Sequence, residues 1–155
     1  KLMGGTHSSL PGPVGQYIVR IAAQPDFPTA IRVIHTAAAS LTSSQNALCV
    51  LFAGGVAAAA PDGGPARKLD PEVRSLVERV ATTGQRILLG RIAIEPVCPG
   101  AESESRRLHH RAAPSRAVLI VHRPPTSAAY SFGELATLSA FAAQLHPVFP
   151  KLLAL

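Results

Sequence analysis

The sequence predicts an α+β domain with a mostly antiparallel central sheet that is flanked by helices. Three observations support this prediction. The 155 residues suffice for one domain with a core, and 47% of them are hydrophobic while only 15% are charged. Short apolar runs alternate with glycine-rich or proline-rich turns, which is typical of strands joined by hairpins. Longer segments carry apolar residues at helical spacing, so we expect helices to cover the sheet.

Composition and charge exclude several classes of protein. No stretch approaches the roughly 20 apolar residues of a membrane helix, and two cysteines are too few for a disulfide framework or a four-cysteine zinc site. The net charge of +6 comes mainly from scattered arginines. One cluster follows two glutamates and contains no aromatic residue that could stack on bases: Arg106, Arg107, Arg111, Arg116 and Arg123. We therefore expect no nucleic-acid partner and a solvated loop face.

The chain divides into three predicted parts. Residues 1–15 are rich in Gly, Ser and Pro and predict a flexible leader without the apolar core of a signal peptide, so we expect a cytoplasmic protein. Residues 16–147 predict a single domain. Residues 148–155 predict a short apolar tail that packs on the domain or leads into a neighbour.

The first half of the domain predicts a helix followed by a hairpin. Pro28 suits a first helical turn, and apolar residues recur at helical spacing from about Pro28 to Ser43. The run from Ala47 to Phe52 predicts a strand buried on both faces. Gly54-Gly55 predicts the turn of a hairpin, because glycine adopts positive φ at little cost, and Val56 to Ala60 would be the returning strand.

The middle of the chain predicts a second helix and further strand structure. Asp70 at the N-cap and Pro71 at the first helical position begin this helix, and Gly84 ends it. Residues Arg86 to Ile94 predict a strand, in which Gly90 marks either a bulge or a break between two strands.

The last third predicts a loop, a strand and a capped helix. The polar segment from Glu95 to Ser115 predicts a long loop, and Arg116 to His122 predicts a strand. Ser131 and Glu134 have the spacing of a capping box at the start of the last helix, which Pro147 ends.

Two stretches of the sequence resemble a GAF domain. From Val77 to Leu89, a helix, a Thr-Gly-Gln turn and an apolar strand follow one another in the family's order. From Val118 to Pro125, an apolar strand leads into a proline–arginine loop, and Phe132-Gly133-Glu134-Leu135 matches the Phe-x-x-Glu-Leu that opens the family's terminal helix. The resemblance covers about Pro28 to Leu145 and implies the GAF and PAS type of architecture, which is similar to profilin.

The chain departs from the ligand motifs of several GAF subgroups. It lacks the Asn-Lys pair and the Phe-x-x-x-Asp-Glu string of cyclic-nucleotide binders. A bilin-binding member would carry a Cys-His pair or the phytochrome cysteine context, whereas Cys49 precedes Val50 and Cys98 precedes Pro99. The resemblance therefore favours neither a cyclic nucleotide nor a bilin, and any cofactor stays unidentified.

The resemblance implies a non-catalytic sensory or regulatory domain. Family members bind a small ligand between the sheet and the loop and helix that cover one face. In this chain the loop from Glu95 to Ser115 would cover a pocket lined by Cys49, Leu51, Ile92, Ile94, Cys98, Leu119 and Val121. Ligand binding would order the cover and act on the terminal helices. The apolar faces of the first and last helices also predict a homodimer.

Two alternatives remain open at this point. A degenerate GAF-like domain could serve only protein contacts, which predicts a filled core without a cavity. A thiol-dependent enzyme similar to the GAF-like methionine sulfoxide reductase would require a reactive Cys98. We expect no metal at His109 and His110, because neighbouring side chains point apart, and no haem at His35 or His122. The sequence also contains neither a P-loop nor a Gly-x-Ser-x-Gly motif.

Overall fold

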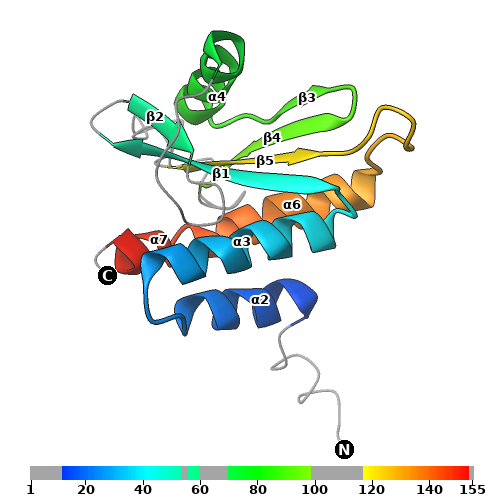
Figure 1. The fold of residues 1–155 in the computed structure, drawn as a ribbon. Helices are drawn as coiled ribbons and strands as arrows, with labels where there is room; N and C mark the ends of the chain where they lie inside the picture. The colour runs from blue at the N-terminus through cyan, green and yellow to red at the C-terminus, as the bar shows by residue number, and fades with distance from the viewer. Residues whose placement is uncertain (1–11, 54–55, 60–69, 99–116, 154–155) are drawn as a thin grey trace, which may run out of the picture.

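The computed structural model describes residues 12–53, 56–59, 70–98 and 117–153. Figure 1 shows how the elements of these ranges follow one another along the chain. In order, they are α2 (Pro13–Ala22), α3 (Phe27–Leu41), β1 (Asn46–Ala53), β2 (Val56–Ala59), α4 (Pro71–Thr83), β3 (Ile87–Leu89), β4 (Ile92–Pro96), β5 (Ala117–His122), α6 (Phe132–Leu145) and α7 (Phe149–Leu153).

The described strands pair into one five-stranded sheet in the order β2-β1-β5-β4-β3, and each neighbouring pair is antiparallel. The predicted α+β class with an antiparallel sheet is therefore confirmed. Ala53 lies opposite Val56, which confirms the hairpin predicted at Gly54-Gly55. Gly90 marks a break between two strands, because Leu89 lies opposite Ile92 across a tight turn in which Gly90 has a φ of 57°.

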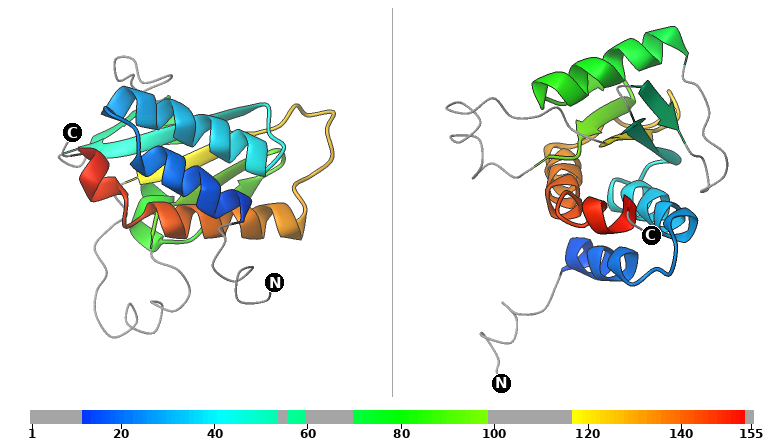
Figure 2. Two further views of the ribbon diagram at one scale, coloured as in Figure 1. Left: turned by 90° about the horizontal axis from the view of Figure 1, so that it is seen from below. Right: turned by 90° about the vertical axis from the view of Figure 1, so that its left-hand side faces the viewer.

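The elements stack in layers, which the end-on view of Figure 2 shows most clearly. Helix α4 lies on one face of the sheet, which we call the α4 face. Helices α3 and α6 lie on the opposite face, and α2 packs against both of them from outside. We call α2, α3, α6 and α7 together the helix layer.

Each face of the sheet has its own hydrophobic core. The larger core joins the sheet to the helix layer and includes Ile31, Ile34, Leu138 and Phe141, all completely buried. The smaller core lies between the sheet and α4, where Val77 and Val80 are also completely buried. This division follows from strand geometry, since successive residues of a strand point to opposite faces.

Helix α3 starts one residue before the predicted position and ends two residues earlier. Asp26 caps it, because its side chain accepts a 2.9 Å hydrogen bond from the backbone N–H of Thr29. The helix ends in a Schellman motif: the N–H of Ser44 donates to the carbonyl of Ala39 at 2.8 Å, and Ser43 has a φ of 51°. A serine therefore occupies a left-handed position that glycine usually fills.

Helices α2 and α7 were not predicted. Helix α2 starts at Pro13, within the predicted leader, and its apolar side packs Tyr17, Ile18 and Ile21 against the helix layer's core. Helix α7 lies in the predicted tail, and its Phe149 and Leu152 are buried in the same core.

The second helix and the strand after it differ from the predictions in two details. Helix α4 begins and ends as expected, with Gly84 at a φ of 70°, but the Asp70 side chain forms no capping hydrogen bond. The segment from Glu95 was predicted as a loop, and this was wrong for its first residues. Glu95 and Pro96 belong to β4, opposite Leu119 and Val118, because half-buried Arg86 donates a hydrogen bond to the buried Glu95 carboxylate.

The last helix is capped as the sequence predicts. The Ser131 hydroxyl accepts from the N–H of Glu134 at 3.1 Å, and the Glu134 carboxylate accepts from the N–H of Ser131 at 2.8 Å. Helix α6 ends at Leu145, two residues before Pro147.

Candidate functional site

The α4 face of the sheet is only partly covered by α4. One row of side chains crosses four strands and consists of Leu48, Ile120, Ile94 and Ile87. Val77 and Val80 of α4 contribute to the core that includes this row. The next row along the strands contains Leu89, Ile92 and His122, and we call it the open row. Leu89 is 49% exposed and Ile92 is 37% exposed, so an apolar surface continues beyond the covered core.

The structure divides the predicted pocket residues between the two faces of the sheet. Ile92 and Ile94 lie on the α4 face. Four others belong to the core of the helix layer or pack against it: Cys49, Leu51, Leu119 and Val121. Cys98 follows β4 and is half-buried. Residues 99–115 of the predicted cover lie outside the described residues.

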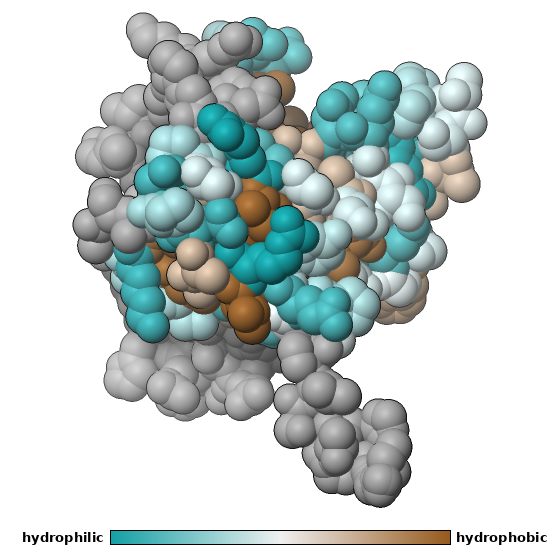
Figure 3. Space-filling model, turned by 60° about the horizontal axis from the view of Figure 1, so that its bottom comes forward, coloured by the Kyte–Doolittle hydropathy of each residue, from teal (hydrophilic) through white to brown (hydrophobic). Residues whose placement is uncertain are grey.

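A surface groove of about 640 Å³ lies between α2, the end of α3 and α6. Its lining includes Tyr17, Arg20 and Thr137, and the Arg20 guanidinium lies 5.8 Å from the centroid of the Tyr17 ring. Figure 3 shows this side of the molecule, where small hydrophobic patches lie among polar side chains. None of the predicted pocket residues lines this groove.

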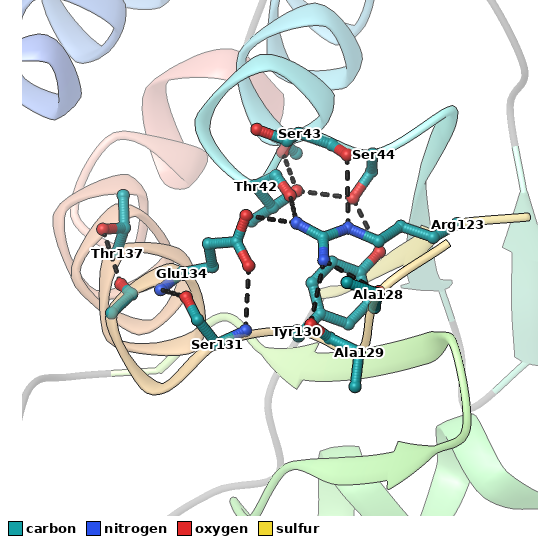
Figure 4. A network of polar contacts seen from close by, with 12 residues as sticks. Thr42, Ser43, Ser44, Arg123, Ala128, Ala129, Tyr130, Ser131, Glu134 and Thr137 are labelled. Carbon is teal, nitrogen blue, oxygen red and sulfur yellow. Dashed lines mark hydrogen bonds and ion pairs between the residues drawn. The ribbon is translucent and has the colours of Figure 1, made fainter. Parts of the chain in front are cut away.

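The most extensive polar network of the described residues centres on Arg123, directly after β5 (Figure 4). Its guanidinium donates to the carbonyls of Thr42 at 2.7 Å and Ser43 at 3.2 Å, at the end of α3. It also donates to the carbonyls of Ala128 and Ala129, each at 3.1 Å, in the loop before α6. A short ion pair joins it to Glu134 in the first turn of α6.

An aromatic ring and a chain of hydroxyls complete this network. The Arg123 guanidinium lies 4.2 Å from the centroid of the Tyr130 ring, a cation–π arrangement. The Tyr130 hydroxyl shares a 2.6 Å hydrogen bond with Ser44, which shares another with Thr42. Thr42 in turn donates to the carbonyl of Ala38 at 2.6 Å. The end of α3 and the start of α6 are thus connected by side chains as well as by packing.

A second arginine connects the sheet to α6. Arg86, just before β3, forms a 2.5 Å ion pair with Glu95 and donates to the carbonyl of Leu135 at 3.0 Å. Glu95 is 6% exposed. Burial raises the pKa of Glu95 above its ordinary value, and the hydrogen bond and charge of Arg86 lower it by less.

Comparison with known proteins identifies the fold. No protein-family model and no curated protein matches the sequence. Among solved structures, the GAF domain of an Acinetobacter phosphoenolpyruvate-protein phosphotransferase matches with a TM-score of 0.63 at 13% identity, over 99% of this chain and 98% of that one. This chain has the GAF fold.

Two further structures support the assignment of the GAF fold. Residues 122 to 287 of a methyl-accepting chemotaxis protein match with a TM-score of 0.64 at 10% identity, over 88% of this chain and 96% of that one. The GAF domain of a Pseudomonas syringae pv. tomato protein described as a sensor histidine kinase matches with a TM-score of 0.53 at 11% identity. That match covers 88% of this chain and 82% of the other.

The remaining candidate groups of this GAF fold are spread over the molecule. His35 of α3 accepts a 2.9 Å hydrogen bond at Nε2 from the backbone N–H of Cys49. Burial raises the pKa of the Cys49 thiol to about 12. Within the described ranges, no three His, Cys, Asp or Glu side chains form a group that could hold a metal. His109 and His110 lie outside these ranges. None of the described helices is both long and apolar enough to cross a membrane.

Sequence reasoning missed the role of Arg123 and the open row. Arg123 was assigned to an arginine cluster in a solvated loop, yet its side chain is only 8% exposed. Most of its partners are backbone carbonyls, which leave no pattern in a sequence. For the open row a signal did exist, since Leu89 and Ile92 flank the Gly90 turn and must share one face of a two-residue hairpin.

Proposed function

We propose that this chain is a non-catalytic, cytoplasmic regulatory domain that binds a small molecule on the α4 face and signals through its helix layer. The main support for the proposal is that α4 covers this face only in part, so that exposed Leu89 and Ile92 continue a partly buried apolar row. Small-molecule sites combine such apolar surface with a few polar groups, and half-buried His122 supplies one beside Ile92. The GAF domains of similar fold in a phosphotransferase and a sensor kinase agree with a regulatory role.

The proposal retains two residues of the predicted pocket and adds three apolar residues besides His122. Ile92 and Ile94 stay in the site, and Leu48, Leu89 and Ile120 join them because they lie in the same two rows. The ligand that fits this surface has an apolar body and a hydrogen-bonding edge for His122. Cys49, Leu51, Leu119 and Val121 would act from beneath, as the packed core that keeps the strands in place.

The edge hairpin offers a matched pair of variants for the test. Leu88 is 46% exposed and Leu89 is 49% exposed, but as neighbours in β3 they point to opposite faces. The full chain with Leu89→Glu should lose any small molecule that native mass spectrometry detects on the wild type, and should bind the apolar dye 8-anilinonaphthalene-1-sulfonate more weakly. Leu88→Glu should retain both. Equal behaviour of the two variants would contradict a ligand site on the α4 face.

A homodimer through the helix layer is the second part of the proposal. Helix α6 exposes Phe132, Ala136 and Ala140 at a spacing of four residues, and Phe132 is 88% exposed. Beside it, the exposed side of α2 carries Val19, which is 62% exposed, and Arg20 as its charged residue. Sedimentation velocity should give a dimer that Ala140→Glu dissociates and that Leu88→Glu leaves intact. A monomer at high concentration would contradict the dimer but not the ligand site.

The same exposed residues of α6 and α2 support the alternative of a module that serves only protein contacts. That alternative predicts that no small molecule copurifies and that Ala140→Glu abolishes association.

The thiol-dependent enzyme is tested by alkylation with iodoacetamide. Cys49, buried with a pKa of about 12, should react only after unfolding. A Cys98 that reacts no faster in the folded chain than in the unfolded chain removes the enzyme alternative, because such catalysis needs an activated thiolate.

A further inference from the structure

The partners of Arg123 belong to segments that are far apart in the sequence. They lie at the end of α3, in the loop before α6 and in the first turn of α6. Because the side chain is only 8% exposed, water cannot replace these partners without opening the structure. Loss of these partners would leave the charge of the buried guanidinium unsatisfied, which is costly. The three segments therefore either move together with the Arg123 guanidinium or lose their hydrogen bonds and ion pair with it.

The other side of this network reaches the open row. Arg123 directly follows β5, the central strand, and its backbone N–H donates to the carbonyl of Arg91 at 2.8 Å. Arg91 sits in the β3–β4 turn beside Ile92, and its Nε donates to the carbonyl of Ser127 at 2.6 Å. Ile120 and His122 of β5 lie on the α4 face, three residues and one residue before Arg123. A change at the open row thus acts on the backbone that carries the guanidinium.

A strained turn lies at the point where the network meets α3. Ser43 has a φ of 51°, a left-handed conformation that disfavours residues with a Cβ atom. Arg123 donates to the carbonyls of Ser43 and of Thr42 before it, so it holds this turn in its strained form. Loss of these two bonds would let the end of α3 relax.

We propose that Arg123 couples the α4 face of β5, where Ile120 and His122 lie, to the helix layer, by making the end of β5, the end of α3 and the first turn of α6 move as one unit. This inference rests on the proposed function in one respect only, namely that a ligand bound at the open row would act through this coupling. The coupling itself is a property of the folded chain and is measurable without a ligand. Arg123 is thus a positioning residue for the helix ends.

The test is a double-mutant cycle read by amide hydrogen exchange on the full chain. Ile120→Ala perturbs β5 on the α4 face, and Arg123→Met removes the guanidinium while keeping much of its volume. The four proteins are the wild type, each single variant and the double variant. Exchange is followed in α4, at the end of α3 (residues 40–45), in residues 128–137, and in α7 as a remote reference.

We expect Ile120→Ala to speed exchange at the two helix ends by about twofold or more when Arg123 is present. In the Arg123→Met background the same substitution should still affect α4 and no longer affect the helix ends. Equal effects of Ile120→Ala in both backgrounds would overturn the proposal. So would an effect in α4 that never reaches the helix ends in the wild type.

A control separates coupling from general loosening. Arg86 also connects the sheet to α6, through the carbonyl of Leu135, whereas the hydrogen bonds to the carbonyls of Thr42 and Ser43 at the end of α3 come from Arg123. In an Arg86→Met background, Ile120→Ala should still reach residues 40–45. If Arg123→Met fails to fold, Arg123→Lys keeps the charge but cannot reach four carbonyls at once, and it should weaken the response at the helix ends. An unchanged response in Arg123→Lys would also overturn the proposal.

Discussion

The left-handed residue at the end of α3 gives a prediction at the scale of a single side chain. Ser43 carries a Cβ atom at a φ of 51°, and its side chain is exposed. Ser43→Gly should raise the free energy of unfolding by up to about 1 kcal/mol, because glycine adopts this conformation without steric cost. Urea denaturation measures the change. Gly84→Ser, at a φ of 70° after α4, should shift stability in the opposite direction. A Ser43→Gly variant less stable than the wild type would contradict the expectation.

Glu95 and Glu134 give opposite pH dependences. Burial raises the pKa of Glu95, so the folded chain binds this proton more tightly than the unfolded chain does. Its contribution to stability is therefore largest at low pH and declines as pH rises from about the ordinary carboxyl pKa of 4.5 through the raised value. Relative to Glu95→Gln, the wild type should lose stability over this range in urea titrations at successive pH values.

Glu134 provides the control of opposite sign. The backbone hydrogen bond from Ser131 is the main cause that lowers the pKa of Glu134 below 4.5, and Arg123 lowers it further. Its stabilising contribution is present above pH 4.5 and is lost as pH falls through the lowered pKa. Relative to Glu134→Gln, the wild type should thus gain stability as pH rises towards 4.5. Slopes of the same sign for both residues would contradict the assignment.

At the scale of an element, the starts of α4 and α6 can be compared directly. Both carry a residue that favours N-caps, but only Ser131 forms the capping hydrogen bonds, whereas the Asp70 side chain forms none. Ser131→Ala should lower the free energy of unfolding by about 1 kcal/mol. Asp70→Ala should cost only a few tenths of this through the helix dipole. Similar losses in both variants would mean that side-chain capping does not distinguish the two helices.

Local patterns explain which elements could be predicted. The hairpin at Gly54-Gly55, helix α4, the strand that ends at His122 and the capping box all depend on residues close together in the sequence, and the structure has them. Helix α2 was missed although Pro13 stands at its first turn and Val14, Tyr17, Ile18 and Ile21 have helical spacing. The glycines and prolines next to this segment are typical of a flexible leader, and the leader was predicted from them.

The predicted pocket residues do not share one face of the sheet, because the face to which each strand residue points could not be predicted from local patterns. The prediction joined Ile92 and Ile94 with Cys49 and Leu119, whereas these pairs face opposite sides of the sheet. Relative register between β1, β5 and β4 decides this, and it is set by pairing across long stretches of sequence. The network of Arg123 is non-local for the same reason, since Thr42 is 81 positions away from it.

At the scale of the whole molecule, one sheet serves two cores. Leu138 of α6 and Val77 of α4 are both completely buried but lie on opposite sides of the sheet. Leu138→Ala should cost about 2–5 kcal/mol and Val77→Ala about 1–3 kcal/mol. Because both cores share the same strands, each variant should shift a single unfolding transition with an unchanged denaturant dependence. A separate early transition in Val77→Ala would show that α4 unfolds independently.

The central position of β5 also determines when the sheet can form during synthesis of the chain. The hairpins β1–β2 and β3–β4 each form from neighbouring sequence, but they lie on either side of β5 in the sheet and do not pair with each other. Until residues 117–122 have left the ribosome, each hairpin exposes an edge that awaits the same strand. A nascent chain halted before that point holds two unjoined halves, and the emergence of six residues turns them into one sheet.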